Sequence, residues 1–248
     1  MKSAVRWALA LGLAVNITGA AHAAPATRIP AIGCPSDGQV GPQPAPHVDA
    51  PKINLSPAVA KRLAFYKGDY DPGVLAPRGW KCLELEGSNG SILIIALSLP
   101  SSDDLLFFRR HIEGPGVELI ERSGETSGRF EMAQLIARVF PAHMDFADKV
   151  IAENIWNASE FPSGPYRRDR MKYRGDRVVE FETPAGTKGL GSWNHMSLNT
   201  DPISGAAFLD RDIINSSILA VRLPKAQADL KPIIIRHFEA AADKPSVE

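Results

Sequence analysis

The chain has 248 residues, and its 28 Lys and Arg are balanced by 28 Asp and Glu, so its formal net charge is zero. Because a neutral chain has no long-range field of one sign, the composition argues against binding to nucleic acid or to an anionic membrane through overall charge. The hydrophobic fraction of 44% is typical of a globular protein with a core. The length fits one domain after a short leader.

The first residues have the layout of an export signal. Lys2 and Arg6 precede an apolar run from Trp7 to Val15, and small residues follow at Ala21 and Ala23. A membrane span needs about 20 apolar residues, and polar residues interrupt this run too early for one. We therefore predict a signal peptide over residues 1–23 and a periplasmic or secreted bacterial protein with no transmembrane span after cleavage.

Residues 24–55 are rich in proline, which removes backbone donors and fixes φ, so we predict an extended arm. The arm contains Cys34, and the only other cysteine is Cys82. An even count in an exported chain favours a disulfide. Two buried free thiols remain an alternative. Lipid attachment is disfavoured because Cys34 lies well beyond the apolar run.

Residues 56–248 are predicted to form a single α+β domain. Ser56 and Pro57 suit a helix start, and apolar residues at Val59, Leu63 and Tyr66 predict one face of that helix. Further helices are predicted at 130–140, near 145, where Asp145 and Asp148 resemble a capping box, and from about 229.

Strands alternate with these helices. The segment 80–86 is predicted to pair with 92–99 through a turn at Asn89-Gly90, and the almost uninterrupted apolar run 92–99 predicts a central strand covered on both faces. Other strands are predicted at 117–121, 203–209 and 217–223, and 105–111 suits a short helix or a strand. The resulting fold class is α+β, with a mainly antiparallel sheet and helices packed on it.

The densest basic segment lies between residues 167 and 177. If Gly175-Asp176-Arg177 forms a three-residue hairpin loop, basic residues of the first strand face acids of the second. This arrangement predicts a solvated hairpin rather than a site for anions. The predicted solvent-side pairs are Lys172 with Glu180 and Arg170 with Glu182, and the core-side pairs are Tyr173 with Val179 and Met171 with Phe181.

A glycine-rich segment over residues 183–195 follows the predicted hairpin. It lacks the Gly-x-Gly-x-x-Gly order of a dinucleotide site, and no helical pattern follows it. Glycines permit close backbone approach, so we interpret it as a loop at the mouth of a pocket. The candidate binding residues are Lys188, Trp193 and His195.

The sequence contains no nucleophile elbow, no His-Glu-x-x-His zinc motif and no phosphate loop. We therefore expect no catalytic residue, metal or cofactor, and predict a non-enzymatic protein that binds a small ligand or an envelope protein. The alternative is a small periplasmic hydrolase that uses His143 or His195 with nearby acids, such as Asp145 and Asp148.

Several short motifs resemble those of an uncharacterised family of exported proteobacterial proteins. They are Gly33-Cys34 through Gly41-Pro42, Val74-Leu-Ala-Pro-Arg-Gly-Trp80-Lys-Cys82, Thr183-Pro184 with Gly189-Leu190-Gly191, and Ala220 through Pro224. The resemblance implies an exported protein with a cysteine pair and transfers no catalytic residue. The order of elements is also similar to that of PsbP and Mog1-like domains, which is an analogy of architecture.

Overall fold

The computed structural model describes residues 27–198, 200–212 and 214–242. The predicted signal peptide, 1–23, lies outside these residues. The described part has mixed helices and strands with antiparallel-rich sheets, which confirms the predicted α+β class.

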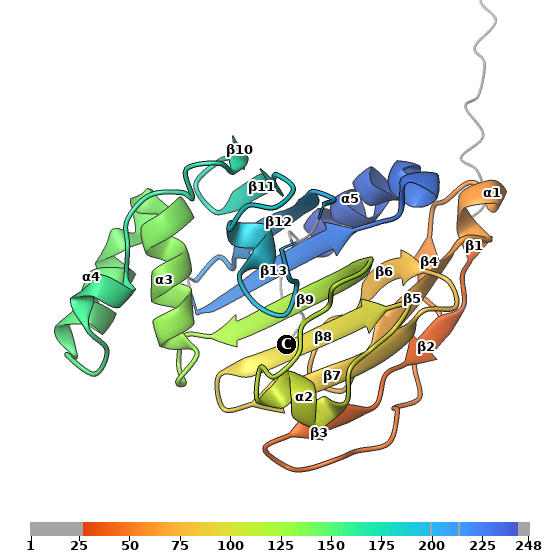
Figure 1. Ribbon diagram of the computed structural model, residues 1–248, viewed down its shortest axis with the longest axis horizontal. Coiled ribbons are helices and arrows are strands. Elements are labelled where there is room, and N and C mark those ends of the chain that lie inside the picture. The colour runs from red at the N-terminus through yellow and green to blue at the C-terminus, as the bar shows by residue number, and fades with distance from the viewer. Residues whose placement is uncertain (1–26, 199, 213, 243–248) are drawn as a thin grey trace, which may run out of the picture.

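The main sheet has eight strands in the order β10-β11-β12-β13-β9-β8-β7-β3 (Figure 1). Its neighbours are antiparallel except at one edge, where β3 runs parallel to β7. The strands are β3 (Ser36–Gly38), β7 (Lys81–Gly87), β8 (Gly90–Ala96), β9 (Gly116–Ser123), β10 (Arg170–Arg174), β11 (Val178–Thr183), β12 (Ile203–Leu209) and β13 (Asn215–Arg222).

Strand β8 is buried from Ser91 to Ala96 and pairs with β7 and β9, which confirms a central strand here. It ends at Ala96 rather than at the predicted residue 99, and Leu97 is exposed. The hairpin is also as predicted, but its turn residues are Ser88 and Asn89. The positive φ lies at Gly90, at 130°. A Cβ atom there would lie 2.1 Å from the carbonyl oxygen of Glu121, so close packing against β9 requires glycine.

Helices and a smaller sheet cover the two faces of the main sheet (Figure 1). One face packs against α2 (Ser102–Leu106), α3 (Arg129–Val139) and α4 (Met144–Ala152). The other packs against α5 (Lys231–Ala242) and a sheet of β2 (Ala31–Gly33), β5 (Leu63–Lys67) and β6 (Val74–Pro77). Two apolar cores therefore share the main sheet as a common wall.

The proline-rich arm is extended, as predicted, and it also contributes strands to the domain. Its β2 runs parallel to β5, its β3 extends the main sheet, and β1 (Thr27–Arg28) pairs with β4 (Lys52–Ile53). The disulfide between Cys34 and Cys82 joins the segment between β2 and β3 to β7. The predicted cysteine pairing is thereby confirmed.

The first predicted helix is wrong beyond its first turn. Ser56 accepts a hydrogen bond from the Val59 N–H, but α1 ends at Ala60. Residues Leu63–Lys67 form β5 instead, between β2 and β6, because tertiary strand pairing overrides a spacing that also fits a helix.

Two helix starts also differ from prediction. Helix α4 begins after His143 without a side-chain cap, so the predicted capping box of Asp145 and Asp148 is wrong. A capping box does form at the 3-10 helix Ala158–Glu160, between Asn157 and Glu160. The predicted last helix begins as the 3-10 helix Lys225–Leu230 and continues as α5. In the segment 105–111, which suited a helix or a strand, only Leu105 and Leu106 are helical, as the end of α2, and 107–111 form neither.

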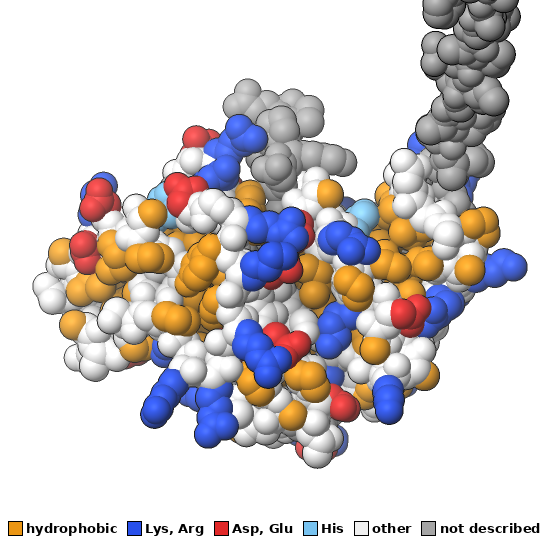
Figure 2. All heavy atoms as spheres, turned by 90° about the horizontal axis from the view of Figure 1, so that it is seen from above, with side chains coloured by type: hydrophobic (Ala, Val, Ile, Leu, Met, Phe, Trp, Pro, Cys, Tyr) orange, Lys and Arg blue, Asp and Glu red, His pale blue; other side chains and the backbone are white. Residues whose placement is uncertain are grey.

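The register of the basic hairpin is as predicted, with Arg170 opposite Glu182 and Lys172 opposite Glu180. The first pair is 2.7 Å apart and the second 3.4 Å. Tyr173 is an exception because it is 48% exposed on the edge strand rather than packed in the core. Figure 2 shows Lys and Arg side chains in separate groups with acids beside several of them, in agreement with the lack of net charge.

The disulfide is expected to stabilise the fold by restricting the unfolded chain. It closes a loop with a sequence separation of 48, which corresponds to about 4 kcal/mol in the chain-entropy model. We expect the double variant Cys34→Ala with Cys82→Ala to lose on the order of 4 kcal/mol in urea unfolding. Reduced wild-type protein is the matched control and should lose a similar amount. An unchanged urea midpoint in both would contradict the expectation.

Candidate functional site

A cavity lies on the face of the main sheet that packs against α3. Two cross-strand pairs form its floor, Ile120 opposite Ile218 and Arg122 opposite Ser216. These residues come from β9 and β13, whose pairing fixes their positions. The floor therefore has an apolar half and a polar half.

The remaining walls come from helix α3 and from three connecting segments. Glu131, Gln134 and Leu135 have the i, i+3, i+4 spacing that places side chains on one face of a helix. Phe108, Trp156, Trp193 and Asn194 complete the lining. The volume of this space is about 230 Å³, and we call it the Arg122 cavity.

Two further cavities share Arg122 with this lining. One, of about 170 Å³, shares Phe108, Arg122, Glu131 and Asn194 with the Arg122 cavity and extends to His195. The other, of about 400 Å³, lies beside the β7–β8 turn. Arg122 is the residue that the linings of all three have in common.

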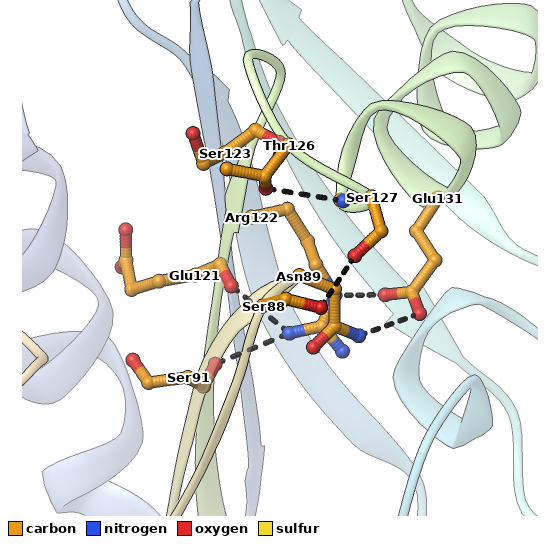
Figure 3. A network of polar contacts seen from close by, with 10 residues as sticks. Ser88, Asn89, Ser91, Glu121, Arg122, Ser123, Thr126, Ser127 and Glu131 are labelled. Carbon is orange, nitrogen blue, oxygen red and sulfur yellow. Dashed lines mark hydrogen bonds and ion pairs between the residues drawn. The ribbon is translucent and has the colours of Figure 1, made fainter. Parts of the chain in front are cut away.

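Arg122 is only 5% exposed, and its charge is held by groups from three elements. Its Nε donates to Glu131 on α3, and its Nη1 donates to the carbonyl oxygens of Ser91, at 3.2 Å, and Glu121, at 2.9 Å (Figure 3). Asn89 Nδ2 donates to the other oxygen of Glu131 at 3.1 Å. Burial lowers the pKa of Arg122 to about 10, so the guanidinium remains charged at neutral pH.

Several polar atoms around these cavities have no protein partner. Among the described residues, Ser216 Oγ, Asn194 Oδ1 and His195 Nδ1 are buried and make no hydrogen bond. Nη2 of Arg122 makes none there either, but it is not one of the buried atoms. Buried polar groups are almost always hydrogen-bonded, so each such atom requires an explanation. The first two line the Arg122 cavity, and His195 lines its neighbour.

His195, which lines the smaller neighbouring cavity, and Glu118 are two further buried residues close to the site. The His195 ring stacks on the Phe108 ring at 4.6 Å between centroids, and its backbone N–H donates to Glu118 Oε1 at 3.0 Å. Burial, followed by the nearby His111 and Arg122, lowers the pKa of His195 to about 4. Burial raises the pKa of Glu118 to about 7. His195 is therefore neutral at neutral pH and suited to packing.

The three predicted binding residues do not lie at one site. Trp193 and His195 line the two adjacent cavities. Lys188 lines a different, open hollow with Tyr166, Arg167 and Arg168. The glycine-rich segment thus contributes to two separate surfaces, because the 3-10 helix Leu190–Ser192 lies between Lys188 and Trp193.

The residues of the hydrolase alternative have different partners. His143 Nε2 lies 3.5 Å from Asp176 in the β10–β11 loop, whereas His195 contacts Phe108 and Glu118. Within the described ranges, no group of three or more His, Cys, Asp or Glu residues is arranged to hold a metal ion. No helix in this part of the chain is long and apolar enough to cross a membrane.

Sequence reasoning missed most of the cavity residues. Arg122 and Ser216 each lie one residue outside the strands predicted at 117–121 and 217–223, although the structure includes them in β9 and β13. Glu131 belongs to a predicted helix, and the spacing of the three residues in the chain gives no sign that they meet. One signal was present, since Glu118, Glu121 and Arg122 place three charges in a strand next to the central apolar one. Charged side chains are seldom buried unless they are paired, so charges in a central strand indicate buried partners.

Comparisons of the chain with protein-family models, curated proteins and solved structures find no match. The candidate site therefore has to be judged on its own geometry.

The raised pKa of Glu118 predicts a loss of stability with rising pH. Between its ordinary pKa of 4.5 and its folded value of about 7, the folded state holds a proton that the unfolded state has released. Stability therefore falls through this window as pH rises. Glu118→Gln removes this titration. The difference in free energy of unfolding between the variant and wild type should therefore shift by about 3 kcal/mol in favour of the variant from about pH 5 to about pH 8.

Urea unfolding at both pH values measures this difference. Glu125→Gln is the matched control because Glu125 is an exposed residue in the connection that follows β9. Its difference from wild type should be the same at both pH values. A Glu118→Gln difference that is also independent of pH would contradict burial of Glu118 as an ionisable group.

Proposed function

We propose that this protein is a non-enzymatic binding protein and that the Arg122 cavity receives a small molecule. One observation carries the proposal: the buried atoms Asn194 Oδ1 and Ser216 Oγ make no hydrogen bond within the described chain, and both residues line one cavity together with Arg122. An unsatisfied buried polar group costs about 1–3 kcal/mol. A ligand that supplies the missing partners recovers this cost on binding.

The construction of the cavity supports the same function. Arg122, Ser216 and Glu131 lie on β9, β13 and α3, which are packed elements, and Asn194 lies in the segment after the 3-10 helix Leu190–Ser192. Glu131 and two carbonyl oxygens hold the Arg122 guanidinium in place. Aromatic and aliphatic side chains form the rest of the wall. A largely preformed apolar pocket with a few convergent polar groups is typical of small-molecule sites.

We further propose that the protein is exported to the periplasm or secreted. The leader-like layout of residues 1–23 and the resemblance to exported proteobacterial proteins support this setting. The disulfide between Cys34 and Cys82 supports it as well, because disulfides persist in oxidising compartments.

Binding can be followed through the NMR resonances of the tryptophan indole N–H groups. Trp156 and Trp193 line the cavity, whereas Trp80 is buried in the core on the other face of the sheet and serves as an internal control. Phenol, cyclohexanol, benzoate and D-galactose are suitable probes. We expect at least one of them to shift the Trp156 and Trp193 resonances and to leave Trp80 unchanged.

A variant with a blocked cavity provides the second control. Gln134 lies on the cavity wall and is only partly buried, so Gln134→Phe should narrow the cavity without disturbing the core. The shifts should be lost in this variant. If no probe affects Trp156 and Trp193 in the wild type, the proposed function is wrong.

Export can be tested by mass spectrometry of the protein from expressing bacterial cells, without reduction. The expected mature form begins at Ala24 and has the mass of the disulfide rather than of the dithiol. A periplasmic or culture-medium fraction should contain it. Recovery of the uncleaved chain from the cytoplasm alone would contradict export while leaving the cavity proposal intact.

A further inference from the structure

The charges that line the Arg122 cavity cancel each other. Arg122 is positive and donates directly to Glu131, whose carboxylate is the one acidic group in the lining. An anionic ligand would approach Glu131 and compete with it for the guanidinium, and a cationic ligand would approach Arg122. Both would bring an unpaired charge into a largely buried site, which is costly. The lining therefore favours a neutral ligand.

The free polar atoms require both hydrogen-bond donors and acceptors from that ligand. Arg122 Nη2 can only donate, Asn194 Oδ1 can only accept, and Ser216 Oγ can do either. Ser216 is 1% exposed, so no bulk solvent reaches its hydroxyl group. A hydroxyl group is a neutral group that donates and accepts through a single atom. Because the polar atoms come from the floor and from the Trp193-Asn194 segment, several hydroxyl groups at different positions match them best.

The size and walls of the cavity favour a ring. Its volume of about 230 Å³ lies below the usual range of about 300–1,000 Å³ for ligand pockets, so the ligand is small. Trp156, Trp193 and Phe108 contribute aromatic side chains to its lining. A compact ring presents an apolar face to such side chains and keeps its hydroxyl groups at the edge.

We propose that the Arg122 cavity binds a neutral ring that carries several hydroxyl groups, the chemistry of a monosaccharide or a cyclic polyol. This inference rests on the proposed function, because it specifies the ligand of the same site. Its polar recognition groups are Arg122, Asn194 and Ser216, and its apolar contacts are Trp156 and Trp193.

The test compares ring compounds that differ in charge and in hydroxyl content. D-galactose, D-glucose and myo-inositol are neutral polyols, cyclohexanol and phenol each carry one hydroxyl group, and benzoate is an anion. Titration of each into the mature protein, followed at the Trp156, Trp193 and Trp80 indole resonances, gives relative affinities. We expect at least one polyol to bind at least tenfold more tightly than cyclohexanol, phenol and benzoate.

Ser216→Ala separates recognition from stability. Removing a buried hydroxyl group that has no protein partner should leave the free energy of unfolding unchanged or higher, while the polyol affinity falls about fivefold to tenfold with the loss of one hydrogen bond. Ser36→Ala is the matched control. Ser36 is also 1% exposed with an unpartnered hydroxyl group, but it lies on β3 and lines none of the three cavities.

Each outcome has a distinct meaning. Tighter polyol binding that Ser216→Ala weakens and Ser36→Ala leaves unchanged supports the proposal. If phenol, cyclohexanol or benzoate shifts Trp156 and Trp193 while every polyol fails or binds more weakly, this inference is overturned and the proposed function stands. Equal polyol affinity for wild type and Ser216→Ala also overturns it. If no compound shifts these resonances, both proposals fail together.

Discussion

The buried guanidinium group of Arg122 is the constraint on which the candidate site depends. A buried charge needs hydrogen-bond partners, and Arg122 finds them in the carbonyl oxygens of β8 and β9 and in Glu131 of α3 (Figure 3). These contacts tie the first turn of α3 to the centre of the sheet. The Arg122 cavity lies beside this connection, and the arginine therefore determines both the position of a wall and the polarity of the floor.

The main sheet keeps further ionisable groups out of water, and each has its own physical role. Burial and the neighbouring Asp71 raise the pKa of Glu84 to about 8. Its carboxyl oxygens accept the backbone N–H groups of Asp69 and Tyr70, and so hold the connection between β5 and β6. Arg222 donates to three carbonyl oxygens that precede β9 or follow Met196. Polar groups inside the sheet thus fix connecting segments as well as the cavity.

Strand pairing and the disulfide attach the extended proline-rich arm to the domain. Proline removes backbone donors, yet short stretches between the prolines still pair in parallel with β5 and β7. The Cys34–Cys82 bridge fastens the chain between these two pairings. The added strand β3 also covers one edge of the main sheet, which limits pairing with other chains.

The sequence by itself determined the features that depend on local pattern: the α+β class, the central strand near residues 92–96, helix α3, the cysteine pair and the register of the β10–β11 hairpin. These follow from apolar periodicity, turn chemistry and opposite charges on facing strands. Only the tertiary structure decided that Leu63–Lys67 is a strand, that Lys188 lies apart from Trp193, and that Arg122, Glu131, Asn194 and Ser216 meet. The physical reason is that strand order, helix placement and long-range ion pairing bring these residues together. Their spacing along the chain does not indicate that they are in contact.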